Sequence, residues 1–408
     1  MRKILFLAEE MAMNGACKSL LALLEALESQ GYDISLFVSL HDGCLHGDIP
    51  KYVKVLPESL PYSIVRMPLK RALLCALQHW RVDLAMMRLV VSFARCFELP
   101  FPCWFMLPQI KGDYDLVCAY ADGFVAQMAI RKVPSGKKAL WIHCDYTQYK
   151  QSKQTFEAFK KADFAVSVSQ DSIEKFKEAA GCDTGVPFKV VHNIIDVDDV
   201  KCRANAYPVP PVGGGGVRIV SVGRICFQKG FDLIVAIARL VSVGRVSFEK
   251  GLDMIPSIAK GISYKQVPFE WDVIGGATTE VMAAHQELVH QNGMDGVVKF
   301  LGQMENPMPY VAAADIVVIP SRFEGWGMTL SEALVLGKPV VATDLPVFRE
   351  QVKNGVNGLL VPLEVNAFAE AIIRLINNPD LRVQLSKAAI DYPFTKDEVV
   401  NEFAELLK

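Results

Sequence analysis

The chain has 408 residues, of which 51% are hydrophobic, and a formal net charge of −2 at pH 7. This length can bury two sizeable cores, and the near-neutral charge gives no general case for binding nucleic acid. Ten cysteines form no CxxC pair, which favours a reducing compartment over a disulfide framework or a zinc site. We therefore expect a cytoplasmic protein.

The first elements follow a strand, helix, strand pattern. Residues 3–8 and 32–39 are short apolar runs typical of buried strands, and residues 19–29 predict a leucine-rich helix. The first run is too short for a signal peptide, and no later run reaches the ~18–20 apolar residues that span a bilayer. The pattern predicts an α/β fold with a doubly wound parallel sheet, whose ligand crevice lies where the strands end. Asn14 and Gly15 form either a plain turn or a loop that faces this crevice.

A basic segment follows in residues 66–95, which hold six basic residues against one acid, Asp83. Apolar residues recur between them near helical spacing, at Leu73, Leu74, Leu77, Trp80, Leu84 and Met87. Two interpretations fit this pattern. The segment forms helices that pack on the core with a solvated basic face, or it forms a basic amphipathic region that lies on anionic lipid.

Residues 137–142 predict another strand, and His143 follows directly. A histidine at the carboxyl end of a parallel strand points toward the crevice, although a lone histidine also serves as a structural residue. Farther on, Asp196 and Asp198 spell Asp-x-Asp, a metal-binding pattern in other proteins. Because Asp199 adjoins them and a linker is near, we interpret these acids as a solvated turn.

Residues 204–216, ANAYPVPPVGGGG, are rich in proline and glycine and predict a linker. We therefore place a first domain at residues 1–203 and a second at residues 217–390, followed by a terminal helix at residues 391–408. The second domain opens with a repeat of period 21: residues 220–239, VSVGRICFQKGFDLIVAIAR, return as residues 241–260, VSVGRVSFEKGLDMIPSIAK.

Residues 315–346 predict a strand, a loop, a helix and a strand. Gly325 and Gly327 allow the loop backbone to approach a ligand closely, and the start of the helix favours a phosphate or sugar oxygen. Glu324 and Glu332 are eight residues apart, about 12 Å if all were helical. They are either solvated carboxylates or two anchors along one elongated ligand.

This stretch resembles a known signature. Residues 321–333, SRFEGWGMTLSEA, and residues 337–343, GKPVVAT, are similar to the donor-binding motif of the retaining glycosyltransferases of family 4, or glycosyl transferases group 1. The resemblance implies the GT-B fold, in which two Rossmann-like, doubly wound parallel-sheet domains face a cleft. It also implies that the helix at residues 391–408 crosses back to the first domain.

The resemblance implies roles for single residues. Glu324 would anchor the donor sugar and Glu332 the ribose, while His143, in a pattern like W-I-H-x-D, would lie in the cleft near the sugar. The other donor contacts would come from Gly15, Gly325, Trp326, Gly327, Met328 and Thr329.

The family's V-G-R-x4-K-G motif, which contacts the donor diphosphate, occurs here twice because of the repeat. The candidates are Arg224 with Lys229 and Arg245 with Lys250. We favour Arg245 and Lys250, because a helix of ordinary length can run from there to the strand predicted at residues 269–274.

The leading hypothesis is a hexosyltransferase that moves a sugar from a nucleotide-diphosphate sugar to a glycan or lipid-linked acceptor in surface polysaccharide or glycolipid synthesis. Side chains and a helix start would neutralise the leaving diphosphate, so we expect no metal and no cofactor. It would act in the cytoplasm, at the inner membrane face if residues 66–95 bind lipid. The alternatives are a non-catalytic nucleotide-sugar-binding protein, in which the repeat has displaced the phosphate loop, and a GT-B-fold epimerase. A dehydrogenase fits less well, since no G-x-G-x-x-G follows the first strand.

Overall fold

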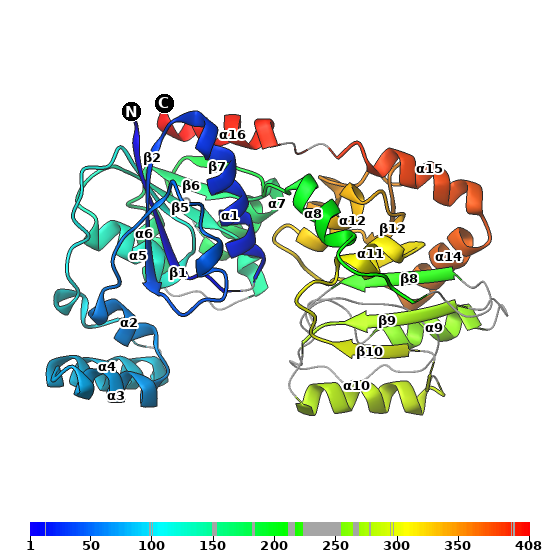
Figure 1. The fold of residues 1–408 in the computed structure, drawn as a ribbon, viewed down its shortest axis with the longest axis horizontal. Helices are drawn as coiled ribbons and strands as arrows, with labels where there is room; N and C mark the ends of the chain where they lie inside the picture. The colour runs from blue at the N-terminus through cyan, green and yellow to red at the C-terminus, as the bar shows by residue number, and fades with distance from the viewer. Residues whose placement is uncertain are drawn as a thin grey trace. The chain divides into compact units, whose positions relative to one another are not determined.

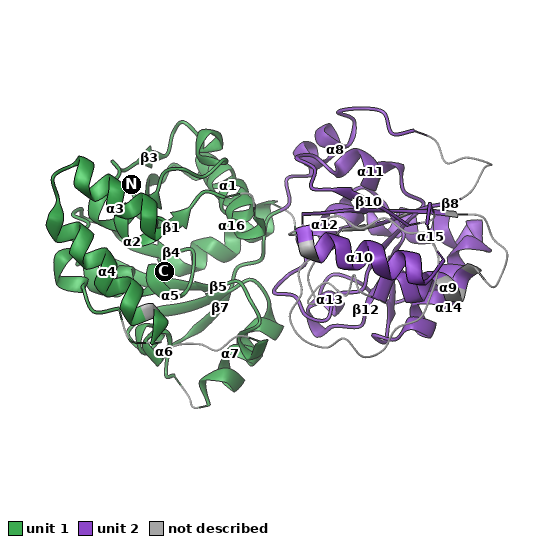
Figure 2. Ribbon diagram, turned by 90° about the horizontal axis from the view of Figure 1, so that it is seen from below, with its two compact units in different colours: residues 1–194, 394–408 green, residues 195–393 purple. Residues whose placement is uncertain are grey.

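The computed structural model describes residues 1–408 except residues 13, 98, 100, 149–152, 182–183, 211–216, 223–253, 264–268, 277–278, 294, 297, 393 and 395. The chain divides into two compact units (Figure 2), unit 1 with residues 1–194 and 394–408 and unit 2 with residues 195–393. Each unit has a parallel sheet flanked by helices (Figure 1). Within the described residues, no helix is long and apolar enough to cross a membrane.

The sheet of unit 1 has seven parallel strands in the order β3-β2-β1-β4-β5-β6-β7. All seven strands therefore end at one edge, which we call the carboxyl edge of the unit. The predicted α/β class and parallel sheet are confirmed. The strands are β1 (Lys3–Glu10), β2 (Asp33–Leu40), β3 (Lys54–Val55), β4 (Leu116–Ala119), β5 (Lys137–Ile142), β6 (Phe164–Ser167) and β7 (Phe188–Val190).

Helices follow the strands of unit 1. The first begins at Gly15, earlier than the predicted residue 19, because the Asn14 side chain accepts a hydrogen bond from the backbone N–H of Cys17 at 2.9 Å and so caps it. The helices are α1 (Gly15–Leu27), α2 (Leu60–Arg66), α3 (Leu69–Gln78), α4 (Val82–Cys96), α5 (Gly123–Lys132), α6 (Lys153–Phe159), α7 (Gln170–Ala180) and α16 (Lys396–Ala404).

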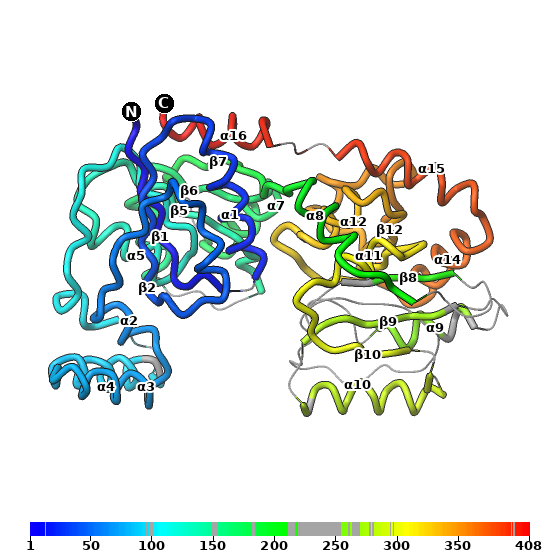
Figure 3. Tube along the Cα trace, in the orientation of Figure 1, coloured from blue at the N-terminus to red at the C-terminus, as the bar shows by residue number. Residues whose placement is uncertain are grey.

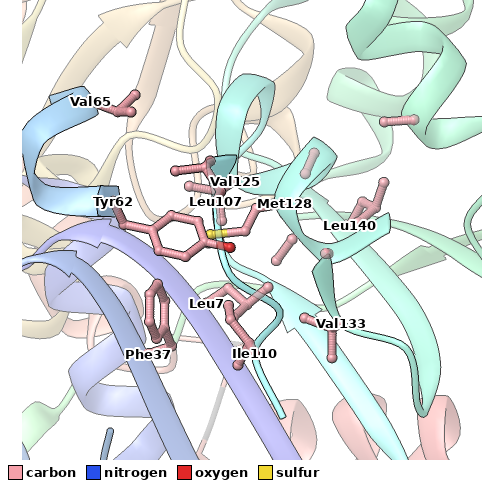
Figure 4. Packing of buried hydrophobic residues seen from close by; sticks show 14 of the residues in the cluster. Leu7, Phe37, Tyr62, Val65, Leu107, Ile110, Val125, Met128, Val133 and Leu140 are labelled. Atoms are coloured by element: carbon pink, nitrogen blue, oxygen red, sulfur yellow. The ribbon is translucent and has the colours of Figure 1, made fainter. Parts of the chain in front are cut away.

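One core cluster joins the sheet of unit 1 to the helices on its face, as the close view in Figure 4 shows. Tyr62 of α2 is fully buried there, with its ring 5.1 Å from that of Phe37. Its hydroxyl donates a hydrogen bond to the Pro108 carbonyl at 2.7 Å, so the buried polar group is satisfied. The cluster anchors α2 firmly to the sheet.

The last helix, α16, belongs to unit 1 although residues 195–393 of unit 2 precede it in the chain. The Phe403 ring is fully buried and stacks on Phe6 of β1 at 5.8 Å. Glu402 accepts a hydrogen bond from the backbone N–H of His192 at 2.9 Å and lies 2.7 Å from that ring's Nδ1. The C-terminal residues thus complete the unit 1 core.

Unit 2 has a six-stranded sheet in the order β10-β9-β8-β11-β12-β13, with parallel pairing throughout. Its strands are β8 (Val217–Val222), β9 (Phe269–Ile274), β10 (Val298–Gly302), β11 (Ile316–Ile319), β12 (Val340–Thr343) and β13 (Leu359–Val361). Its helices are α8 (Val197–Ala204), α9 (Ile255–Ser263), α10 (Thr279–Gln291), α11 (Met308–Ala313), α12 (Met328–Val335), α13 (Pro346–Arg349), α14 (Val365–Ile376) and α15 (Pro379–Ala389).

The repeat contributes to unit 2 from both of its copies. Strand β8 ends at Val222 and holds the start of the first copy, between β9 and β11 in the sheet. Helix α9 holds the end of the second copy, as predicted for the helix after Lys250. Residues 223–253, which include both candidate phosphate-binding pairs, lie outside the described residues.

Candidate functional site

The centre of the candidate site is the loop between β11 and α12, at the carboxyl edge of unit 2. The strand is completely buried, as its apolar run predicts, and α12 begins at Met328 after Gly327, which has a φ of +88°. A Cβ added at Gly327 would lie 2.5 Å from Cε1 of the fully buried Phe348. Both its backbone conformation and this close approach therefore require glycine.

Glu324 is held by its own loop. The hydroxyl of Ser321, which is fully buried at the end of the strand, donates a hydrogen bond to Oε1 of Glu324 at 2.8 Å. The carboxylate is only partly buried, so it is oriented yet still reachable by a ligand. A short, aimed carboxylate of this kind can accept hydrogen bonds from sugar hydroxyls.

Glu332 is buried, with 7% of its surface exposed. It is the fifth residue of α12, so it lies about one turn into the helix and not about two turns, as the sequence interpretation had it, because the loop continues to Gly327. Its Oε1 lies 3.7 Å from a guanidinium nitrogen of Arg203 in α8, and Nε of Arg203 lies 2.7 Å from Oδ2 of Asp199. The charge of Glu332 is therefore compensated inside unit 2.

Asp196 and its neighbours have a structural role that the sequence interpretation as a turn missed. The Asp196 side chain caps α8 by accepting a hydrogen bond from the backbone N–H of Asp199 at 2.8 Å. Asp198 and Asp199 follow in the first turn, where the helix dipole favours negative charge. Across the residues that the structure describes, no group of three or more His, Cys, Asp and Glu side chains could hold a metal ion.

A second layer of side chains supports the loop from behind. The Gln351 amide donates a hydrogen bond to the Trp326 carbonyl at 2.6 Å and accepts one from the Ser331 hydroxyl at 2.7 Å. The Tyr392 hydroxyl donates to the Ser331 oxygen at 2.9 Å, and burial raises the pKa of Tyr392. This buried network fixes residues 325–328. Sequence reasoning missed it, since its members are far apart in the chain.

His143 lies in unit 1, immediately after β5, and so at the carboxyl edge of that unit. Its ring packs against Tyr120 with centroids 4.7 Å apart. Burial lowers the pKa of His143 to about 4, against the opposing effect of a hydrogen bond to the Tyr120 backbone, so the ring is neutral at pH 7. Its Nε2 is buried and has no hydrogen-bond partner among the described residues. A ligand hydroxyl could satisfy this atom.

The same edge of unit 1 also holds Gly15, the first residue of α1, which follows β1. Behind α1, the Ser19 hydroxyl donates to Oδ1 of Asn193 at 2.6 Å and lies 3.1 Å from the Tyr120 hydroxyl. These bonds connect α1 to the ring on which His143 packs. Unit 1 thus brings Gly15 and His143 to one edge, as unit 2 does with Glu324 and Glu332.

Asp122 is an acid at this edge that no sequence motif singles out. It precedes α5, and the Tyr146 hydroxyl donates a hydrogen bond to its Oδ2 at 2.9 Å. Burial raises the pKa of Asp122, while the bonds from Tyr146 and Cys144 act in the opposite direction. The one sequence signal for Asp122 is its position shortly after a strand, at the edge where ligands bind in parallel sheets.

Comparison with known proteins gives a family match over residues 238–392, to the family described as Glycosyl transferases group 1. Over 126 residues, the chain is 36% identical to a D-inositol 3-phosphate glycosyltransferase of Kribbella flavida, which covers 29% of this chain and 30% of that protein. Over 119 residues, it is 29% identical to the lipopolysaccharide core biosynthesis glycosyltransferase LpsE of Rhizobium meliloti, covering 28% and 35%. The chain thus spans about a third of the length of these curated relatives.

Two solved structures are similar over the whole chain. Anabaena HepE in complex with UDP and glucose has a TM-score of 0.65 at 21% identity, covering 100% of this chain and 99% of that one. S. aureus TarM, in a complex that contains UDP, has a TM-score of 0.68 at 13% identity, covering 100% of both chains. At these identities the likeness establishes the fold.

Proposed function

Because the chain belongs to the glycosyl transferases group 1 family and has the GT-B fold, we propose that it is a retaining glycosyltransferase of the hexosyl type. It moves a sugar from a nucleotide-diphosphate sugar to a glycan or lipid-linked acceptor in surface polysaccharide or glycolipid synthesis. The observation that carries the proposal is the loop after β11, where an oriented Glu324, a sterically required Gly327 and a buried Glu332 lie within one strand-loop-helix unit.

The donor would lie along this unit. Glu324 would accept hydrogen bonds from the sugar, and Glu332 from the ribose, while the backbone between them, from Gly325 through Trp326 to Thr329, lines the donor. The start of α12 supplies backbone N–H groups and the positive end of the helix dipole, which favour a phosphate. The support behind the loop, through Gln351 and Ser331, lets these groups meet the donor without reorganising.

His143 would meet the sugar from unit 1. Its ring is neutral at pH 7, and the buried Nε2 needs a hydrogen-bond partner. A sugar hydroxyl matches this need, whereas a diphosphate would favour the charged ring that burial opposes. We therefore propose that His143 contacts the sugar and that Gly15 contacts the neighbouring part of the donor.

The diphosphate would be bound by one of the two repeated pairs, and two observations favour different copies. Strand β8, between β9 and β11, belongs to the first copy, which carries Arg224 and Lys229. The family match begins at residue 238 and so includes the second copy, which carries Arg245 and Lys250. We keep the second pair as the proposal, because it lies within the family match and directly precedes α9.

Neutralisation of the leaving group by side chains and a helix start would make a divalent cation unnecessary. We expect transfer to continue in excess chelator, measured as release of nucleoside diphosphate. Loss of transfer that manganese or magnesium restores would contradict this. The site of action would be the cytoplasm.

The repeat also supports a second candidate, a nucleotide-sugar-binding protein without transfer activity, since a family motif stands here twice. A panel of UDP-, GDP- and ADP-sugars tests both functions, with thermal stabilisation reporting binding and nucleotide release reporting turnover. Glu332→Ala should reduce the stabilisation, and Glu370→Ala, on an exposed position of α14, should leave it unchanged. Stabilisation without turnover for every donor and acceptor would favour the binding protein. If no sugar nucleotide stabilises the protein, both the transferase and the binding-protein functions are refuted.

A further inference from the structure

Helices α3 and α4 form a hairpin that follows α2, and the chain path in Figure 3 shows them side by side. Side chains of unit 1 fix the hairpin near the carboxyl edge. Arg66, at the end of α2, pairs with Glu9 near the end of β1, and Arg71 pairs with Asp42 directly after β2. The hairpin therefore lies at the edge of unit 1 that also holds His143.

Helix α4 is apolar on two opposite faces. One face, with Leu84, Met87 and Val91, is buried in the core cluster. On the other side, apolar residues recur at spacings of four, three and four, which places them on one stripe. They are Val82, Met86, Leu89 and Phe93, with 62%, 56%, 44% and 61% of their surface exposed.

Helix α3 and the turn extend the exposed apolar surface. Leu74 and Leu77 are 62% and 56% exposed, and Trp80 is 91% exposed. Together with the stripe on α4, these three residues define what we call the apolar hairpin face. A surface helix normally turns polar residues to water, so this face indicates an apolar environment outside the unit.

Trp80 occupies an unusual position at the tip of the hairpin. Its φ is +56°, and the backbone N–H groups of Trp80 and Arg81 donate to the carbonyls of Leu77 and Ala76 at 3.0 and 2.9 Å. This is the Schellman end of a helix, where glycine is the usual residue because a side chain opposes positive φ. Trp80 thus has both a costly backbone conformation and an indole ring that is almost fully exposed at the tip.

Most basic side chains of residues 66–95 are already paired within unit 1. Arg81 pairs with Asp83 at 2.6 Å, and the buried Arg88 donates to the Met67 carbonyl at 3.0 Å. With Arg66 and Arg71 also paired, four of the predicted cations already have partners. Lys70 remains exposed on α3, one turn before Leu74. The face is thus mainly apolar with a sparse cationic rim.

We propose that the apolar hairpin face inserts into the headgroup region of a lipid bilayer, and that it brings the carboxyl edge of unit 1 to a lipid-linked acceptor. The statement about the acceptor rests on the proposed function. A bilayer fits better than a protein partner because the face combines an aliphatic stripe with a tryptophan at the tip, the residue enriched at the membrane interface. The exposed Lys70 on the rim complements anionic headgroups.

Co-sedimentation of the full chain with vesicles tests the proposal, using phosphatidylcholine alone and phosphatidylcholine mixed with phosphatidylglycerol. The triple variant Trp80→Ser/Met86→Ser/Phe93→Ser should lower the partition coefficient by at least about tenfold on both compositions. The matched control replaces three exposed apolar residues of unit 2, as Val356→Ser/Val383→Ser/Ile390→Ser, and should bind like the unchanged protein. Because the face is mainly apolar, phosphatidylglycerol should raise the partition coefficient of the unchanged protein by a smaller factor than the triple substitution lowers it.

Three results would overturn the proposal. The unchanged protein could fail to bind either vesicle, or the triple variant could bind as well as the control. Alternatively, the unchanged protein could sediment as a dimer that the triple variant dissociates, with no vesicle binding by either, which would assign the face to a second copy of the chain. Thermal melting of each variant checks that it is folded.

A separate readout keeps the proposed function distinct from this inference. Donor hydrolysis and transfer to a water-soluble acceptor should be equal in the unchanged protein and the triple variant, whereas transfer to a vesicle-borne acceptor should fall with binding. If only the triple variant loses vesicle binding and neither protein shows any activity, the proposed function is refuted and the proposed membrane surface is supported. Equal use of a vesicle-borne acceptor by both proteins would refute the statement about the acceptor.

Discussion

The carboxyl edges of the two sheets hold their candidate residues by different means. In unit 2, hydrogen bonds from neighbouring side chains fix the loop after β11, through Ser321 on Glu324 and Gln351 on the Trp326 carbonyl. In unit 1, His143 is held by ring packing on Tyr120 and by burial that suppresses its charge. The difference teaches that unit 2 presents a rigid set of acceptors, whereas unit 1 presents a ring whose function depends on staying neutral.

The largest effect should come from Gly327→Ala, which disturbs the rigid loop after β11 in unit 2. Positive φ and the contact with Phe348 together should cost about 2–4 kcal/mol in the free energy of unfolding and abolish donor binding. Gly355→Ala is the control, since its φ of +78° is similar but a Cβ there meets nothing within 4 Å. It should cost about 1 kcal/mol. Chemical denaturation and nucleotide titration measure both, and equal effects would show that Phe348 does not constrain the loop.

The repeated pairs should come next. Charge-assisted contacts to a phosphate contribute about 1.5–3 kcal/mol each, so Arg245→Ala/Lys250→Ala should weaken donor binding by at least about a hundredfold. The matched variant Arg224→Ala/Lys229→Ala should have little effect in the same titration. The reverse result would give the diphosphate to the copy that contains β8, and tolerance of both would favour the non-catalytic function.

The two carboxylates of the unit 2 loop should then separate by role. Glu332→Ala should weaken nucleotide binding by roughly tenfold, while Glu324→Ala should leave binding nearly unchanged and lower turnover by roughly tenfold. Isothermal titration with the nucleoside diphosphate and initial rates with the sugar donor measure the two effects. Full tolerance of both substitutions would remove the central claim about the donor site.

The last prediction concerns pH and tests the buried ring of unit 1. Because the pKa of His143 is about 4 in the folded chain and about 6.5 when unfolded, the unfolded state binds more protons between these values. The free energy of unfolding of unit 1 should therefore fall as the pH drops from 6.5 to 4, by no more than about 3 kcal/mol. His143→Asn should flatten this slope. An unchanged slope in His143→Asn would mean that the ring is not buried in solution.

The strands of both sheets could be predicted from the sequence, because buried parallel strands leave continuous apolar runs. The loop after β11 could also be predicted, because Gly325 and Gly327 follow one such run. The packing behind that loop could not. Gln351 and Tyr392 are 20 and 61 residues from Ser331, and nothing in a one-dimensional pattern joins them. The depth of Glu332 in its helix could not be predicted from spacing either, because α12 begins only at Met328, after Gly327 in a left-handed conformation.

The segment at residues 66–95 shows a second limit. Its apolar and basic spacing predicts amphipathic helices, and α3 and α4 confirm helices there. The sequence pattern does not reveal that Glu9 and Asp42, from distant parts of the chain, neutralise Arg66 and Arg71. It also assigns Leu84 and Leu74 to one periodic set, whereas the first is buried and the second exposed.

The placement of α16 in unit 1 has a consequence for the order in which the protein is made. Residues 1–194 leave the ribosome first, yet the ring of Phe403 that stacks on Phe6 is translated after all of unit 2. The first unit to emerge is thus the last to complete its core, and until then its β1 and β5 lack the cover of α16. Emergence of residues 394–408, and not synthesis of residue 194, is the event at which unit 1 can reach its full stability.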